Sequence, residues 1–191
     1  MADVHSTMKL IVEDSKNTLI YPKRYFSMLR GKSDLVQSIL KAVVYGAAAG
    51  ILGMIWRFAV PSAYDGMFMA PGGIMQLLGA VVASIIALFV GAAIVLVFSA
   101  IGGGSTDFEA AARVSASILV LYPVYVLFGI FAAVNFFLAY ALSLAVSLYG
   151  IFLLYCALYL ALGCREKTAR IIAILLAIIP LIMLIRVVMH A

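Results

Sequence analysis

The most ordered group of polar residues in this hydrophobic sequence is the run Gly102–Phe108, GGGSTDF. A glycine-rich loop can hold a phosphate group with its backbone N–H groups, because glycine adopts conformations that other residues avoid. A phosphate loop of this kind also needs a preceding strand and a lysine that reaches the phosphates. Neither feature is present here, so we interpret Gly102, Gly103 and Gly104 as a tight turn.

The residues after the glycines predict the start of a helix. Thr106 and Glu109 have the T-x-x-E spacing of a capping box, in which both side chains accept from free N–H groups at the helix start. Asp107 and Glu109 fall in the first turn, where the helix dipole favours acids. Arg113 follows Glu109 by four residues and is within reach of an ion pair with it.

Few other residues offer chemistry. The two histidines, His5 and His190, lie near the chain ends, which argues against histidine-assisted catalysis and against a metal cluster. Cys156 and Cys164 are two helical turns apart, about 12 Å, which is too far for a disulfide within one helix. Ionisable groups inside a membrane mark function, and the apolar runs contain almost none. We expect no catalytic residue, no metal, no cofactor and no enzymatic activity.

The composition places the chain in a membrane. Hydrophobic residues make up 66% of the 191 residues, charged residues 11%, and the mean hydropathy is +1.20, whereas soluble domains are about 25% charged. The net charge of +5 comes from bases beside hydrophobic segments, a pattern typical of membrane proteins. We expect membrane lipids as partners and no nucleic acid.

Uninterrupted apolar runs of about 20 residues are long enough to cross a bilayer. They predict an all-α fold, a polytopic membrane helix bundle with five transmembrane helices in residues 33–191. The expected spans are 35–58, 74–101, 110–134, 136–162 and 169–189.

Residues 1–32 are predicted to be a cytoplasmic tail with a short interfacial helix. Residues 1–17 have no hydrophobic period and are expected to be loosely ordered. In the following segment one helical face is apolar and carries Pro22, Tyr25, Phe26 and Leu29. The bases that flank this face are Lys23, Arg24 and Arg30. This pattern is typical of a helix that lies on lipid headgroups with its aromatic side down.

Small residues and prolines predict how the spans pack. Gly46 and Gly50 form a GxxxG pair, which allows close approach of two helices, in the same chain or in a homo-oligomer. A second ridge of small residues, in the second span, consists of Ala83, Ala87 and Gly91. Pro123 and Pro180 are expected to bend spans three and five.

A polar path through the bundle is the alternative to a purely structural role for these prolines. Transporters place polar groups at the bilayer midplane, often on helices interrupted by Gly or Pro. Tyr122, Pro123 and Asn135 supply part of such a path, and a small transporter or channel-like protein is the alternative function.

The distribution of bases predicts the orientation. Eleven of the 13 Lys and Arg residues lie on the side of the N-terminus, the glycine turn and the loop before the last span, and only Arg57 and Arg186 lie on the other. Because cytoplasmic loops are enriched in bases, we expect the N-terminus in the cytoplasm and the C-terminus outside.

Several motifs, in this order and spacing, resemble the Yip domain family, whose eukaryotic members bind Ypt/Rab GTPases. They are P-x-x-Y-F at Pro22–Phe26, GGGSTDF at Gly102–Phe108, A-x-R-V at Ala111–Val114, Tyr122–Pro123 in span three, and Tyr155, Tyr159 and Leu162–Gly163 before a basic loop. The resemblance implies a five-span bundle with a non-catalytic role in membranes. Only about 35 residues precede the first span, so the chain looks similar to short prokaryotic members, with a plasma (inner) membrane location and no expected Rab-type GTPase partner.

The leading interpretation is a membrane-organising or adaptor protein that binds a partner protein or anionic lipid at its cytoplasmic face. The residues expected on that face are Lys23, Arg24, Arg30, Asp107, Glu109, Arg113, Arg165, Lys167 and Arg170.

Overall fold

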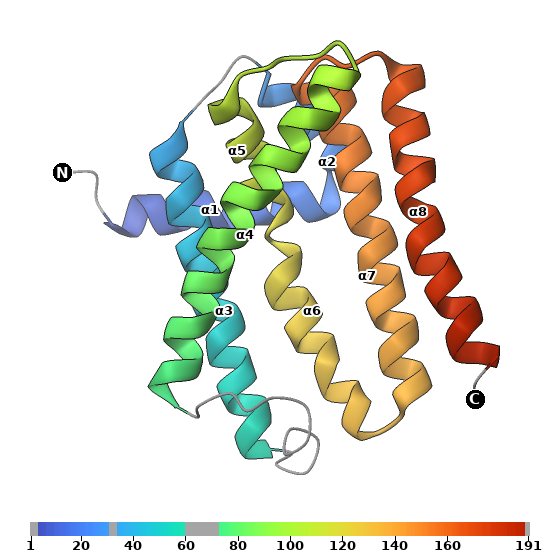
Figure 1. Cartoon of the computed structure of the whole chain (residues 1–191). Helices are drawn as coiled ribbons and strands as arrows, with labels where there is room; N and C mark the ends of the chain where they lie inside the picture. The colour runs from blue at the N-terminus through green and yellow to red at the C-terminus, as the bar shows by residue number, and fades with distance from the viewer. Residues whose placement is uncertain (1–3, 31–33, 60–72, 190–191) are drawn as a thin grey trace.

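The computed structural model describes residues 4–30, 34–59 and 73–189, and every regular element in these residues is helical. Within these residues, five helical segments are long and apolar enough to cross a membrane, which confirms the predicted all-α polytopic bundle. The elements are α1 (Val4–Ile20), α2 (Pro22–Met28), α3 (Leu35–Ala59), α4 (Ile74–Ile101), α5 (Phe108–Ile118), α6 (Leu121–Gly129), a 3₁₀ turn (Ile130–Ala133), α7 (Phe136–Cys156), a π turn (Ala157–Ala161) and α8 (Glu166–Met189). Figure 1 shows the spans side by side, with α1 running across them.

The first 17 residues do not form the loosely ordered tail that their composition suggested, because α1 is a regular helix from Val4 to Ile20. Its buried side holds Ile11, which packs with Tyr45 of α3 and Val120 between α5 and α6. Leu19 packs against the same cluster, and the polar side chains beside it make hydrogen bonds. A search for apolar periodicity misses such a helix, since hydrogen bonds to other spans replace part of the hydrophobic face.

Glycines bring α3 into direct contact with the backbone of α4. A Cβ at Gly46 would lie 2.8 Å from the Val81 Cα, and a Cβ at Gly50 would lie 3.0 Å from the Leu77 Cα. The buried Ser84 hydroxyl donates across the same contact to the Ala42 carbonyl at 2.8 Å. The structure therefore places the GxxxG pair at a contact within the chain, where only residues without a side chain fit.

The second ridge of small residues is arranged differently from the prediction. Ala83 and Ala87 are exposed, whereas Gly91 faces α5, where its Cβ would lie 2.4 Å from the Ser115 Oγ. The stripe that α4 buries consists of Ser84, Leu88, Ala92, Val95 and Ser99. The two stripes have similar spacing, so spacing alone does not tell which one faces the bundle.

The third span consists of two helices and not of one helix bent at Pro123. α5 ends at Ile118 and α6 begins at Leu121. Pro123 lies in the first turn of α6, where a missing N–H is tolerated, and the Leu119 carbonyl accepts from the Tyr122 N–H at 2.9 Å instead. In the fifth span Pro180 lies inside α8, and the bend expected there stays a prediction.

We expect Gly46→Ala to lower the free energy of unfolding by about 1–3 kcal/mol, because the new methyl group would press on the α4 backbone. Gly79→Ala is the matched control, since its Cβ would meet nothing within 4 Å and alanine favours helix by about 1 kcal/mol. Unfolding in mixed detergent with increasing dodecyl sulfate measures both. Equal effects of the two substitutions would contradict the α3–α4 contact.

Candidate functional site

The glycine turn lies against the loop between α7 and α8. The Ser105 N–H donates to the Leu162 carbonyl at 2.8 Å, and the Arg165 N–H donates to the Gly102 carbonyl at 3.1 Å. Gly103 and Gly163 have φ angles of 69° and 74°, a left-handed conformation that favours glycine. The two loops therefore form one hydrogen-bonded surface, and we call the end of the bundle that carries it the basic end.

Cys164 fills the space beneath the turn. Its Sγ would lie 2.9 Å from a Cβ at Gly102 and 2.7 Å from a Cβ at Gly104. Two of the three glycines are therefore required by close packing, and Gly103 by its backbone angle. Burial raises the pKa of the Cys164 thiol, because the thiolate is poorly solvated there.

The start of α5 differs from the predicted capping box. Asp107, and not Thr106, is the residue that caps the helix, and its Oδ1 accepts from the Glu109 N–H at 3.0 Å. The Ser105 hydroxyl accepts from the Asp107 N–H at 3.2 Å, which shifts the helix start by one residue. Arg113 donates to Gln37 of α3 at 3.0 Å, so it turns toward the neighbouring span and not toward Glu109.

The aromatic face of α2 is buried in the protein. Tyr25, Phe26 and Leu29 are all buried and pack against the π turn and the end of α7. The expectation that these rings lie on lipid headgroups is therefore wrong. An apolar helical face does not distinguish lipid from protein as its neighbour.

The motifs that are far apart in the sequence meet in this core. Tyr25 and Phe26 of P-x-x-Y-F share one cluster with Ala111 and Val114 of A-x-R-V and with Leu162 before the basic loop. The glycine turn and Cys164 close the same region from outside. The sequence motifs are thus one structural unit at the basic end.

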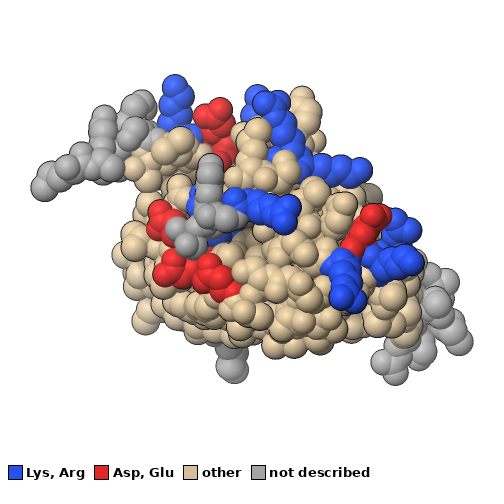
Figure 2. Space-filling view, turned by 90° about the horizontal axis from the view of Figure 1, so that it is seen from above, with Lys and Arg blue, Asp and Glu red and all other residues tan. Residues whose placement is uncertain are grey.

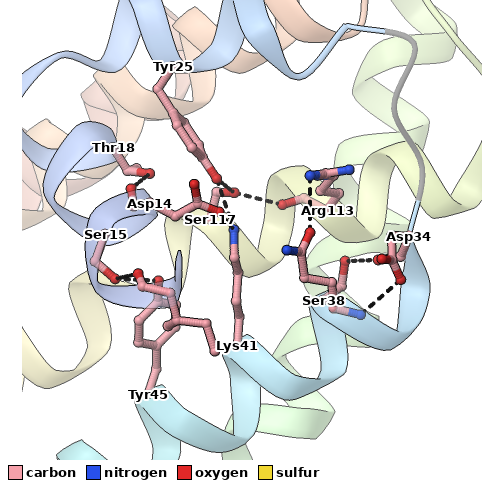
Figure 3. A network of polar contacts seen from close by, with 12 residues as sticks. Asp14, Ser15, Thr18, Tyr25, Asp34, Ser38, Lys41, Tyr45, Arg113 and Ser117 are labelled. Atoms are coloured by element: carbon pink, nitrogen blue, oxygen red, sulfur yellow. Dashed lines mark hydrogen bonds and ion pairs between the residues drawn. The ribbon is translucent and has the colours of Figure 1, made fainter. Parts of the chain in front are cut away.

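Beside this core, a lysine is buried inside the bundle (Figure 3). Lys41 of α3 is 1% exposed, and its Nζ donates to Asp14 Oδ2 at 2.5 Å and to the Tyr25 hydroxyl at 3.0 Å. The Tyr25 hydroxyl is also 3.0 Å from the Ser117 hydroxyl of α5. One ammonium group therefore joins α1, α2, α3 and α5.

A second contact repeats this arrangement one helical turn further along α3. The Tyr45 hydroxyl lies 2.8 Å from the Ser15 hydroxyl. Ser15 in turn donates to the Ile11 carbonyl, and Thr18 donates to the Asp14 carbonyl. The polar side of α1 is thus held by its own backbone and by two side chains of α3.

We expected the apolar runs to contain almost no ionisable group. This expectation overlooked Lys41, which was considered only among the bases that predict the orientation. A signal was present, because Lys41 lies within a predicted span and a charge there requires a partner. Asp14 is 27 residues away in a segment expected to be loosely ordered, so the sequence did not indicate it. Lys41 has two partners and is a structural centre of this end.

The exposed bases of the predicted surface gather at the basic end, which Figure 2 views from above. They are Lys23, Arg24, Arg30, Arg165, Lys167 and Arg170, and we call them the basic surface. Arg30 adjoins the other loop, since its Nη2 would be 3.7 Å from a Cβ at Gly163. Arg170 pairs with Glu166 at 2.6 Å. Asp107 and Glu109 are exposed at the start of α5, whereas Arg113 is half-buried and faces inward.

A groove of about 660 Å³ runs between α4, α5, α6 and α7. Tyr122 lines it, together with mainly aliphatic residues. Asn135 is not among its lining residues, and its side chain caps α7 by accepting from the Leu138 N–H at 3.1 Å. The structure therefore does not join Tyr122 and Asn135 into one polar path.

Among the described residues, no group of three or more His, Cys, Asp or Glu side chains could hold a metal.

We expect Asp14→Ala to lower the free energy of unfolding by about 3 kcal/mol, because the buried Lys41 ammonium would lose its counter-ion. This value is at the lower end of the cost of removing one partner from a buried ion pair, because the Asp14 side chain is 27% exposed. Glu13→Ala, at the exposed neighbouring position, is the control and should change the free energy of unfolding by less than about 0.5 kcal/mol. Adding Lys41→Met to Asp14→Ala should recover part of the loss, measured by unfolding in detergent. No recovery in the double variant would contradict the pair.

For Cys164, the raised pKa predicts slow reaction with a water-soluble maleimide at neutral pH in a Cys156→Ala background. The rate should continue to rise at pH values above about 8.5, where an ordinary thiol is already half ionised, because a raised pKa moves formation of the thiolate to higher pH. Labelling of the same chain unfolded in dodecyl sulfate provides the reference. Equal rates in the folded and unfolded chains at pH 7 would show that the thiol is not protected.

Comparison with known proteins agrees with this arrangement of motifs. The sequence model of the Yip1 domain matches residues 16–187. No curated protein and no solved structure matches the chain. The matched region includes α2 with its aromatic motif, the glycine turn and all five spans. The predicted resemblance is confirmed, and the chain is an integral membrane protein that belongs to the Yip1 domain family.

Proposed function

We propose that this protein is a non-catalytic membrane-organising or adaptor protein whose basic surface binds an acidic partner, either the headgroup of an anionic lipid or an acidic protein segment. One observation carries the proposal. Exposed bases from α2 and from the start of α8 lie at the same end of the bundle, where α2 packs on the π turn before the α7–α8 loop and this loop is hydrogen-bonded to the glycine turn. A surface held in this way keeps its charges in place without a partner, which lowers the ordering cost of binding.

Ion pairs neutralise little of the positive charge of the basic surface. Of the six bases, Arg170 is paired with Glu166 in an exposed i,i+4 pair, and such pairs are weak. Cationic residues next to a membrane attract anionic lipids with about 1 kcal/mol each. This supports a partner that carries several negative charges.

We infer that the basic end faces the cytoplasm, with α8 leading to the outside. The inference rests on the excess of bases at this end, which is characteristic of cytoplasmic loops. The buried Lys41 is compatible with a non-catalytic role, because two protein side chains, Asp14 and Tyr25, hold its ammonium group.

The triple variant Lys23→Glu/Arg24→Glu/Arg30→Glu tests the basic surface. At about 1 kcal/mol for each base, it should weaken binding of phosphatidylglycerol or of an acidic peptide at least tenfold. Native mass spectrometry in gentle detergent counts the retained lipids. The charge-conserving variant Lys23→Arg/Arg24→Lys/Arg30→Lys is the matched control and should bind like the unmodified protein. Equal lipid and peptide binding by the reversed variant would show that this surface is not the binding site.

A further inference from the structure

α1 lies across the spans on one side of the bundle (Figure 1). Near its middle, Ser15 contacts Tyr45 of α3, and near its end the Leu19 carbonyl accepts from the Tyr149 hydroxyl of α7 at 2.6 Å. One helical turn before Ser15, Ile11 packs on Tyr45 and Val120. α1 therefore passes from α3 to α7, and its first turns extend beyond α3 at the edge of the bundle.

The contacts of α1 lie within the spanning segments and not above them. Tyr45 is ten residues after the start of α3 at Leu35, which corresponds to about 15 Å along the helix. Tyr149 is twelve residues before the end of the π turn at Ala161, about 18 Å at the same rise. A helix that runs across the spans at this level lies in the plane of the membrane.

The two α3 contacts also fix which flank of α1 faces the membrane interior. Asp14 binds Lys41, and Ser15 binds Tyr45, which is one turn further from the basic end. The flank that carries Ser15 therefore points toward the opposite end of the bundle (Figure 3).

At 3.6 residues per turn, the other residues of the Ser15 flank are Met8, Val12 and Leu19. Met8 is 45% exposed and Val12 is 65% exposed. Charged side chains occupy the outer side of the helix, where Lys9, Glu13 and Lys16 are exposed. An exposed apolar flank directed inward, beside a charged outer side, suits a membrane helix whose long lysine side chains reach back to the headgroups.

We propose that α1 is an in-plane membrane helix, with Met8 and Val12 inserted among the phospholipid acyl chains of one leaflet and with the long side chains of Lys9 and Lys16 reaching from its outer side to the headgroups. The bilayer itself is the partner, and the recognition is hydrophobic on the inner flank and electrostatic on the outer side. The proposal is independent of the basic surface, which lies on α2 and α8.

Spin labels test the depth of the two flanks. In a Cys156→Ala/Cys164→Ala background, Val12→Cys and Leu10→Cys form a matched pair. Both positions are exposed and apolar, at 65% and 53%, but they lie on opposite flanks. In vesicles of neutral phosphatidylcholine, the Val12 label should be accessible to oxygen and shielded from a water-soluble nickel chelate. It should lie several ångströms deeper than the Leu10 label, because a helix with its side chains is about 10 Å wide. Equal depths, or a deeper Leu10 label, would overturn the proposal.

A second measurement uses the unmodified chain and so does not depend on the folding of a variant. Phosphatidylcholine with a photoreactive diazirine on one acyl chain is cross-linked in vesicles, and the adducts are mapped by mass spectrometry. Adducts on Met8 or Val12 are expected beside those on the outer faces of α4 and α8. Adducts on the spans without any on α1 would place α1 outside the acyl region. Neutral lipid keeps this outcome separate from the test of the basic surface.

Discussion

The arrangement of the N-terminal third depends on one buried ammonium group. Transfer of a lysine charge from water into a protein interior costs several kcal/mol unless a counter-ion and hydrogen bonds replace the lost solvation. Lys41 obtains both, from Asp14 and from Tyr25. Because these partners come from α1 and α2, neither helix can leave its place without exposing or stranding the charge. A single desolvated group thus fixes two helices that hydrophobic contacts alone would hold less specifically.

Close backbone contact is the second constraint, and it acts at both the centre and the basic end. Gly46 and Gly50 allow α3 to touch the backbone of α4, and Gly102 and Gly104 allow the turn to rest on Cys164. Hydrophobic burial gives little selectivity inside a bilayer, where lipid is as apolar as the helix surface, so packing and hydrogen bonds determine which helices meet. The Ser84 and Ser105 hydrogen bonds mark those places.

The spans were predictable from the sequence because length and hydropathy alone determine them. The family motifs were predictable too, although their meeting in one core required the fold. Predictions from sequence patterns were wrong where the environment of a residue depends on a neighbouring helix. The apolar face of α2 turned out to contact protein, and the polar stretch of α1 turned out to be helical because α3 supplies its partners. Asp107 replaced Thr106 as the cap because Ser105 takes a hydrogen bond that local spacing does not reveal.

Two spans depart from regular α-helix, at Leu119–Val120 and at the π turn Ala157–Ala161, and the N-terminal helices pack on both places. These contacts join residues that are far apart in the chain, such as Ile11 with Val120, and the Leu19 carbonyl likewise accepts from Tyr149 of α7. During synthesis, α1 and α2 emerge long before the surfaces that receive them exist. Their docking must therefore be a late step of assembly, after the fourth span has entered the membrane, and until then the Lys41 charge lacks its final environment.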